Sequence, residues 1–313
     1  MRRYFLFILC GLLLAGCAGN SIPSSIPPEM YTEAAKTVSV QLTQSFLQTP
    51  SATPTNTAEP TPTITITPEP SPTLPSPTAT WVYHTRGSID APILVYYHIA
   101  DDASDYPDFD ATAVDQMSSG KLQEHMLDLR EKGYDSVTME TMINTLLYGA
   151  EMPAKPIVIT FDSTAAGIYQ KAFPVLQSAG YVGNVYVTVS QIGQDGMLTV
   201  DQLKELLASG WSVGSHGMYG NDLTANHDAI SEEISASRLQ LEEMLGAPVT
   251  IFSYPFGRTD DIILSRISTW GYQAALGLHW YDSTTHTTDY LFYLSRLEIG
   301  NDANGDQVIS NLP

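Results

Sequence analysis

Short apolar runs alternate with longer amphipathic segments from about Trp81 to Pro313. The short runs are rich in β-branched and aromatic residues, which is typical of strands, and the longer segments have helical periodicity. Strands that alternate with helices predict an α/β domain built on a parallel sheet or barrel. The predicted strands are Ile93–Ile99, Ser136–Thr138, Ile157–Phe161, Gly183–Val189, Trp211–Ser215, Thr250–Tyr254 and Tyr272–Gly277.

Local signals mark the ends of the intervening helices. Thr199 and Gln202 have the spacing of a capping box, so a helix is expected to start there. Other helices, among them Lys121–Lys132 and Ile168–Ala179, are each followed by a glycine, the residue that most easily takes the left-handed conformation beyond a helix end. These glycines are Gly133, Gly180 and Gly246.

The N-terminus has the pattern of a bacterial lipoprotein signal. Basic residues precede the apolar run Tyr4–Leu14, and Leu14–Cys17 reads L-A-G-C, a lipobox. The run is too short to span a membrane, so residues 1–16 are expected to be removed and Cys17 to carry a lipid. The protein would then be extracytoplasmic and anchored to a bacterial cell membrane. An ordinary cleaved signal with a chance cysteine is the alternative.

Residues 17–80 are expected to form a tether. From about Thr49 the sequence alternates Pro, Thr and Ser, a composition that cannot bury enough apolar surface to fold. At about 3.1 Å per residue it would reach on the order of 100 Å. Met30–Leu47 has apolar residues at four-residue spacing, which predicts either a marginal helix or a self-association element. Residues 81–313 are then the folded domain.

The charge of the chain limits the classes of partner that it can bind, and its cysteine content limits the disulfides that it can form. The formal net charge is −20, which disfavours nucleic acid and anionic lipid headgroups and is compatible with neutral or partly deacetylated cationic glycans. Solubility alone is a second explanation of the charge. Both cysteines, Cys10 and Cys17, lie at the N-terminus, so the folded domain has no disulfide to form.

Two segments carry a family resemblance. Ile157–Thr164 reads I-V-I-T-F-D-S-T, and Gly214–Leu223 reads G-S-H-G-M-Y-G-N-D-L. They resemble the T-F-D-D-G and G-S-H-T-x-x-H-x-x-L motifs of the polysaccharide deacetylases, also called NodB-homology proteins or carbohydrate esterase family 4. The resemblance implies a distorted (β/α) barrel, with Asp162 as general base and His216 as a metal ligand. Ser163 and Gly220 stand where the family has its other two metal ligands.

A third motif adds a histidine to this site. Pro92–His98 ends in Tyr-Tyr-His and is similar to the P-V-L-x-Y-H opening of one branch of the family, which implies that His98 is the general acid. A structural histidine at a strand end is the alternative. Barrels of this class place their chemistry at the carboxyl ends of the strands, and Asp162, His216 and His98 all fall there.

Phe252–Gly257 reads F-S-Y-P-F-G and resembles the family's F-x-Y-P-x-G segment. The resemblance implies that Tyr254, Pro255 and Phe256 form an aromatic wall for a sugar, and a rigid turn with a buried aromatic ring is the alternative. Leu294–Leu297 resembles the L-P-R-I element of the family and is expected to be mainly structural.

The missing ligands leave two functions open. The first is metal-dependent hydrolysis of the acetamido groups of N-acetylated cell-wall or exopolysaccharide glycans, for which the family implies a divalent metal such as zinc. The second is glycan binding by a homologue that has lost metal-dependent catalysis, and a lipoprotein scaffold is a third reading. Because two ligands are replaced, weak or absent metal binding is expected. Rescue would need another group near His216, and the residues considered are Asp222, His227, His279, Asp282 and His286.

Overall fold

The computed structural model describes residues 79–278 and 284–313. The described residues all belong to one compact unit, Pro72–Pro313. The predicted signal segment, Cys17, the tether up to residue 78 and two of the rescue candidates, His279 and Asp282, lie outside the described residues. No helix in the two described ranges is long and apolar enough to cross a membrane.

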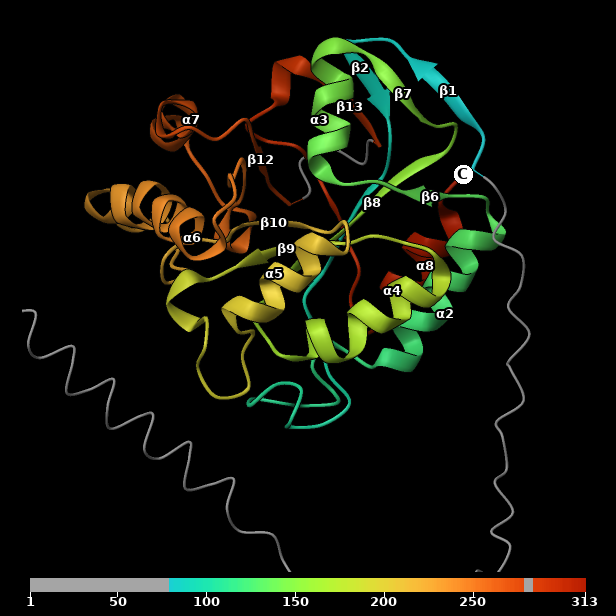
Figure 1. The fold of residues 1–313 in the computed structure, drawn as a ribbon, viewed down its shortest axis with the longest axis horizontal. Coiled ribbons are helices and arrows are strands. Elements are labelled where there is room, and N and C mark those ends of the chain that lie inside the picture. Colours follow the sequence, from blue (N-terminus) through green and yellow to red (C-terminus); the bar gives the residue numbers. More distant parts are fainter. Residues whose placement is uncertain (1–78, 279–283) are drawn as a thin grey trace, which may run out of the picture. The chain divides into compact units, whose positions relative to one another are not determined.

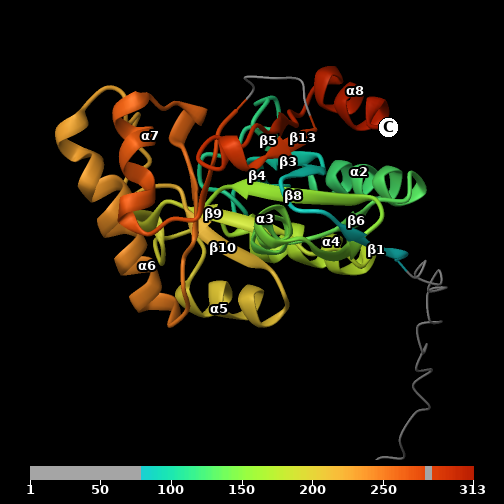
Figure 2. The ribbon, with the colours of Figure 1, turned by 90° about the horizontal axis from the view of Figure 1, so that it is seen from above.

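A curled parallel sheet forms the centre of the domain (Figures 1 and 2). The predicted strands each have a counterpart in it, with most ends displaced by one or two residues, because apolar runs buried on both faces are well marked in the sequence. The predicted Ile93–Ile99 strand divides at Tyr97, and its second half, β4 (His98–Ile99), pairs with β5 (Gln116–Met117). In spatial order the sheet consists of β12 (Ala274–Leu276), β11 (Ile251–Ser253), β10 (Ser212–Ser215), β9 (Asn184–Val187), β8 (Pro156–Asp162), β3 (Ile93–Tyr96) and β14 (Leu297–Glu298), and β6 (Asp135–Ser136) also pairs with β8.

The segment from Leu294 to Glu298 joins the two sides of the sheet. Leu294 bridges to Leu276 of β12, and the Gly277 amide donates to the Leu294 carbonyl at 3.0 Å. A few residues later β14 pairs with β3. The sheet therefore curls into the distorted barrel that the family resemblance implied.

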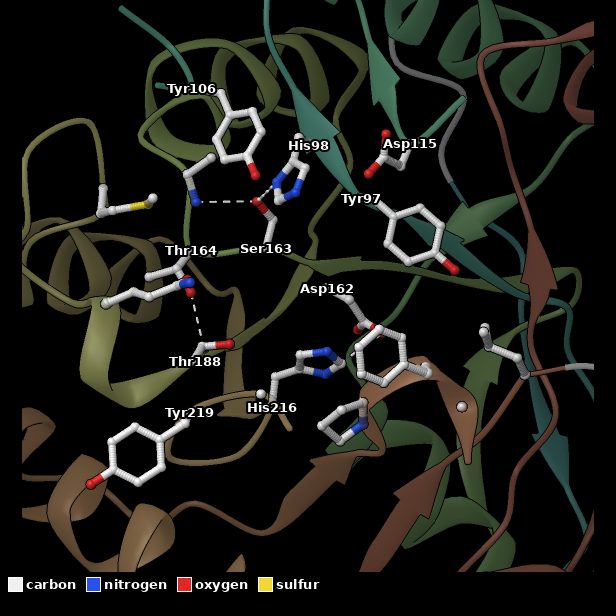
Figure 3. A pocket seen from close by; sticks show the side chains of 18 of the residues that line it. Tyr97, His98, Tyr106, Asp115, Asp162, Ser163, Thr164, Thr188, His216 and Tyr219 are labelled. Atoms are coloured by element: carbon white, nitrogen blue, oxygen red, sulfur yellow. Dashed lines mark hydrogen bonds and ion pairs between the residues drawn. The ribbon is translucent and has the colours of Figure 1, made fainter. Parts of the chain in front are cut away.

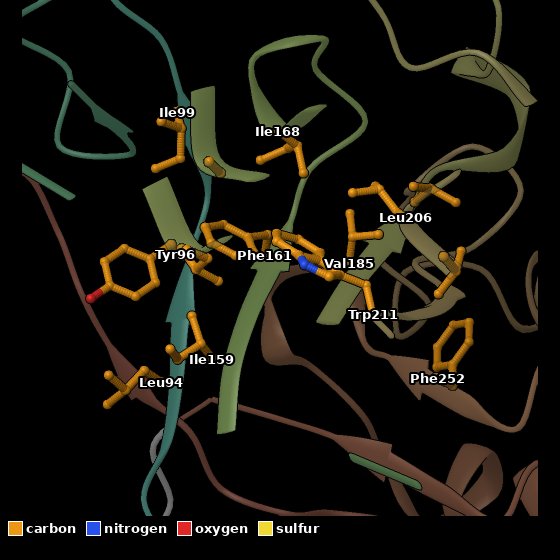
Figure 4. Close-up of a cluster of buried hydrophobic side chains, with 14 of the residues drawn as sticks. Leu94, Tyr96, Ile99, Ile159, Phe161, Ile168, Val185, Leu206, Trp211 and Phe252 are labelled. Carbon is orange, nitrogen blue, oxygen red and sulfur yellow. The ribbon is translucent and has the colours of Figure 1, made fainter. Parts of the chain in front are cut away.

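Alternation along β8 divides its side chains between two cores. Ile157, Ile159 and Phe161 belong to the cluster between the sheet and the outer helices, part of which is drawn in Figure 4. Val158 belongs to a second cluster with the first residues of β3, β11 and β12 and with α3 (Met139–Tyr148). Helix α3 thus covers the amino ends of the strands. Asp162 is on the same face of β8 as Val158 and lies at the opposite, carboxyl end of the strand.

The outer helices bury their apolar faces against the first cluster. The predicted caps are confirmed: Gly133, Gly180 and Gly246 have φ values of 80°, 74° and 70°, and Thr199 and Gln202 form a capping box. The α-helices of this layer are α2 (Ser119–Glu131), α4 (Phe173–Ala179), α5 (Val200–Ala208), α6 (Ser237–Leu245), α7 (Asp261–Ile267) and α8 (Ala303–Asn311). The shorter helical turns are η1 (Ile168–Ala172), η2 (Val189–Gln191), η3 (His227–Ala229), η4 (Ser231–Ala236), η5 (Pro255–Gly257), η6 (Ser268–Trp270) and η7 (Thr288–Tyr290).

Two antiparallel pairs were not predicted. β1 (Trp81–His84) pairs with β7 (Ala150–Pro153), and β2 (Ser88–Asp90) pairs with β13 (Thr285–Thr287). Each of these strands has only three or four residues, and β1 is mostly exposed. None of them therefore gives the longer apolar run that marks a buried strand in the sequence.

Candidate functional site

A pocket of about 480 Å³ opens at the carboxyl ends of the strands (Figure 3). Asp162 ends β8, His216 follows β10 directly, and His98 begins β4, so the barrel brings together the three polar residues that the sequence placed at strand ends. The other side chains on the pocket wall include Tyr97, Tyr106, Asp115, Ser163, Thr188, Tyr219, Phe256 and Glu298.

Asp162 is buried, and both of its carboxylate oxygens are bonded. Arg296 donates from Nη1 to Oδ1 at 2.8 Å and from Nη2 to Oδ2 at 2.7 Å, and the Ser253 hydroxyl donates to Oδ2 at 2.8 Å. Burial raises the pKa of this carboxyl, but the charge of Arg296, a smaller effect of His216 when that residue is protonated, and these hydrogen bonds outweigh it. The pKa of Asp162 therefore lies below its ordinary value, and the group is a fixed carboxylate at neutral pH.

Arg296 is the site residue that the sequence reasoning missed. It was expected to be mainly structural, yet it is only 1% exposed and forms a two-pronged ion pair with Asp162. Its Nε also donates to the Gly277 carbonyl at 3.1 Å, which fixes the guanidinium inside the barrel. The signal available in the sequence was a charged residue in a segment that otherwise matches a family element, Leu294–Leu297.

His216 lies beside this ion pair. Its Nδ1 is 3.9 Å from Oδ2 of Asp162, and this nitrogen is buried without a hydrogen-bond partner in the described structure. Burial lowers the pKa of His216, and the opposing charge of Asp162 does not fully offset it. His216 is thus a mostly neutral imidazole, the form in which histidine binds metals.

Ser163 makes a different set of contacts from a metal-binding aspartate. Its Oγ lies 2.8 Å from Nδ1 of His98 and accepts a hydrogen bond from the Ala165 amide at 3.1 Å. The position where the family has a second carboxylate is therefore occupied by a hydroxyl that bonds to the backbone and to His98.

Gly220 lies in a loop whose backbone suits glycine. Its φ is 73°, and a Cβ built there would come 3.2 Å from Oγ1 of Thr188. Glu233, which is 1% exposed, holds the loop by accepting from the Tyr219 amide at 3.0 Å and from the Asn221 side chain at 2.7 Å. A histidine at position 220 would therefore be strained in this conformation.

The described residues do not fit the expected metal centre. No group of three or more His, Cys, Asp and Glu side chains within the described ranges is arranged to hold a metal ion. Among the described residues, the carboxylate that pairs with His216 is that of Asp162, and both of its oxygens already accept hydrogen bonds.

The rescue candidates within the described residues are placed elsewhere. Asp222 accepts from Arg258 at 2.6 Å and caps its own turn at Thr224, while His227 pairs with Asp260 at 2.6 Å. His286 is buried in β13.

His98 is the third polar group of the pocket. Its ring stacks on Tyr106, with ring centroids 3.9 Å apart and planes 17° apart. Burial lowers the pKa of His98, and the nearby charge of Asp115 opposes that effect without cancelling it. The imidazole is thus mostly neutral and held in one plane.

The three residues predicted to form an aromatic wall are divided between the pocket and the core. Phe256 is 63% exposed on the pocket rim and has the left-handed φ of 58°, and Pro255 also lines the pocket. Tyr254 was wrongly placed in this wall: it is fully buried in the outer core and donates to the Phe292 carbonyl at 3.0 Å. The reason is strand alternation, because the neighbouring Ser253 points inward to Asp162.

Comparisons with known proteins agree with this fold. The polysaccharide deacetylase family model matches residues 149–275, which include the segments around Asp162 and His216. YxkH, a candidate polysaccharide deacetylase of Bacillus subtilis (strain 168), is 28% identical over 199 residues, which are 63% of this chain and 67% of YxkH. The poly-beta-1,6-N-acetyl-D-glucosamine N-deacetylase of Staphylococcus aureus (strain MRSA252) is 23% identical over 49% of this chain and 57% of its own length.

Structural similarity extends further along the chain. The crystal structure of BA0330 from Bacillus anthracis, a candidate polysaccharide deacetylase, superposes with a TM-score of 0.62 and 25% identity over 72% of this chain and 70% of that one. The barrel, the pocket at its carboxyl end and these matches lead to one conclusion. This chain belongs to the polysaccharide deacetylase family.

Proposed function

We propose that this protein binds an acetylated glycan in the pocket at the barrel mouth and that metal-dependent deacetylation is not its main activity. The proposal rests on two features of the same pocket. Its rim presents aromatic rings that suit a sugar, and its set of metal ligands is incomplete among the described residues. Ser163 is bonded to His98 and Ala165, and Gly220 has no side chain, so the described residues do not give His216 the partners that a zinc site needs.

The rim of the pocket supports the choice of a glycan. Phe256 and Tyr219 are 63% and 53% exposed and both line the pocket, so each presents an aromatic ring to an incoming ligand. Phe256 is also the one non-glycine residue with positive φ among the described residues, a strain of about 1–3 kcal/mol that points to a functional constraint. Sugar rings have apolar C–H faces that pack on such rings.

Relatives and charge suggest the class of glycan. The Staphylococcus aureus relative is named for poly-beta-1,6-N-acetyl-D-glucosamine, so oligomers of N-acetylglucosamine are the first ligands to test. The net charge of −20 is compatible with such neutral chains and with their partly deacetylated, cationic forms.

The location belongs to the same proposal. The lipobox ending at Cys17 and the Pro/Thr/Ser-rich segment from about residue 49 support a lipid-anchored domain held away from the outer face of a bacterial cell membrane. A glycan of the cell wall or an exopolysaccharide would be within reach of a domain tethered in this way.

One observation favours a second candidate, metal-dependent deacetylation as in the family. Asp162 is ionised and lies 3.9 Å from His216, so the residues that would act as base and as one ligand are neighbours. Water activation by a metal would still need ligands that the described residues do not bring to His216.

The test measures binding and hydrolysis separately. We expect Phe256→Ala to weaken binding of β-1,6-linked N-acetylglucosamine oligomers roughly tenfold, equal to about 1.4 kcal/mol, by calorimetry. Tyr148→Ala is the matched control, because Tyr148 is 73% exposed on α3 at the other end of the barrel. A chelator should leave binding nearly unchanged. Acetate release from the same oligomers that is abolished by a chelator would establish the second candidate instead.

A further inference from the structure

Ser163 and His98 form a hydrogen-bonded hydroxyl–imidazole pair on the wall of the pocket (Figure 3). Their Oγ and Nδ1 atoms are 2.8 Å apart, which is the separation expected between a nucleophilic hydroxyl and its general base. Neither partner is shared with the ion pair of Asp162 and Arg296. The pair is therefore a second chemical unit in the same pocket.

The hydroxyl is oriented for proton transfer. A serine oxygen has one proton to donate and two lone pairs that accept. The Ala165 amide donates to Oγ at 3.1 Å and occupies one lone pair, and the proton can then point to Nδ1 of His98. The second lone pair remains for attack on a substrate.

His98 has the properties of a base. Its ring is held by stacking on Tyr106 at 3.9 Å, and burial keeps the imidazole mostly neutral, so Nδ1 can accept a proton. Asp115 lines the same pocket, and its carbonyl accepts from the His98 amide at 3.0 Å. The negative charge of Asp115 favours the imidazolium that forms when His98 takes a proton.

We propose that Ser163 is a nucleophile and His98 its general base, and that the pocket removes acetyl groups from sugar hydroxyls without a metal. This goes beyond glycan binding by assigning a reaction to a part of the pocket that the family's metal chemistry does not use. An O-acetyl ester is the substrate class, because its alkoxide leaving group departs far more easily than the amine of an acetamide.

The reaction balances with water as the only co-reactant. His98 takes the hydroxyl proton as Ser163 Oγ bonds to the acetyl carbon. The bond from that carbon to the sugar oxygen then breaks, and His98 returns the proton to the departing oxygen. Water attacks the acetyl-serine and gives a proton to His98. The acyl–Oγ bond breaks, Oγ regains the proton, and acetate leaves.

The experiment uses the full-length protein with a chelator present throughout. p-Nitrophenyl acetate is the substrate probe, and a fluorophosphonate is the covalent probe for an activated serine. We expect labelling of Ser163, located by peptide mass spectrometry, and a rate of nitrophenol release that falls about 100-fold in Ser163→Ala and in His98→Gln. Ser178→Ala, which removes an exposed hydroxyl on α4, should retain the parent rate.

Each outcome decides the question. Absence of label at Ser163 in the parent protein overturns the proposal whether or not the variants fold, and so does a Ser163→Ala variant that hydrolyses at the parent rate. Glycan affinity measured on the same Ser163→Ala sample separates this result from the binding proposal, because binding without labelling leaves that proposal intact.

Discussion

The buried ion pair between Arg296 and Asp162 makes a strong prediction about stability. Replacement of Arg296 by Met, which keeps much of the side-chain length, removes the positive charge and leaves a carboxylate that is 7% exposed without its main partner. Removal of one partner from a buried pair typically costs about 3–5 kcal/mol. We expect Arg296→Met to lower the free energy of unfolding at pH 7 by that amount, measured by urea denaturation with circular dichroism.

An exposed pair in the same domain provides the matched control. Arg258 donates to Asp222 at 2.6 Å, but its side chain is 65% exposed, and such pairs contribute about 0.2–1 kcal/mol. Arg258→Met should therefore cost several-fold less than Arg296→Met. A double variant with Arg296→Met and Asp162→Leu should recover much of the lost stability, because it removes the unpaired charge as well.

The pH dependence of this prediction follows from the two states of Asp162. In the parent protein the pKa of Asp162 is below the ordinary value of 3.8, so its stabilising contribution is present above about pH 4 and is lost as the pH falls through the folded pKa. In Arg296→Met the burial that raises the pKa remains while the opposing charge is gone. The destabilisation should then shrink as the pH falls from 7 toward 4.

Two results would refute this reasoning. One is an Arg296→Met variant that unfolds within about 1 kcal/mol of the parent at pH 7, because a loss that small is typical of exposed pairs. The other is a double variant that is no more stable than the single one, which would show that the cost comes from lost packing rather than from the unpaired carboxylate.

Two further predictions concern the anchor and the metal site. Cys17→Ser should release the protein from the membrane or block its maturation, which incorporation of labelled lipid would measure; lipid-free Cys17 in the parent would contradict the anchor. Ser163→Asp with Gly220→His should raise zinc affinity in calorimetry, because ligands act jointly. Since Gly220 has a φ of 73°, the histidine should also cost about 1–3 kcal/mol of stability, and Gly220→Ala measures that strain alone. A double variant that binds no more zinc than the parent would show that positions 163 and 220 do not face His216.

The strands of the barrel could be predicted because each is an apolar run that is buried on both faces. The pairing of β1 with β7 could not, because these strands lie about 70 residues apart in the sequence and β1 is mostly exposed. The hydrophobic periodicity of the sequence indicates which segments are buried, but it does not indicate which exposed segments pair as strands.

The candidate site could likewise be predicted only in part from the sequence. The convergence of Asp162, His216 and His98 followed from their positions at strand ends. The burial of Tyr254 could have been predicted from its parity with Phe252, since both belong to the outer core. The ion pair of Arg296 could not, because it depends on the segment that closes the barrel more than 130 residues after β8.

Stability alone is a sufficient reason for an aspartate at position 162. The Arg296 guanidinium is 1% exposed and needs acceptors for its N–H groups, and Asp162 provides two of them with the compensating charge. Positions 163 and 220 do not have to neutralise a buried charge. Ser163 bonds to His98 and to the Ala165 amide, and the loop that contains Gly220 is held by hydrogen bonds from Tyr219 and Asn221 to Glu233. Metal ligands can therefore be absent from this barrel while the aspartate remains, so the presence of Asp162 is evidence for the fold and not by itself for hydrolysis.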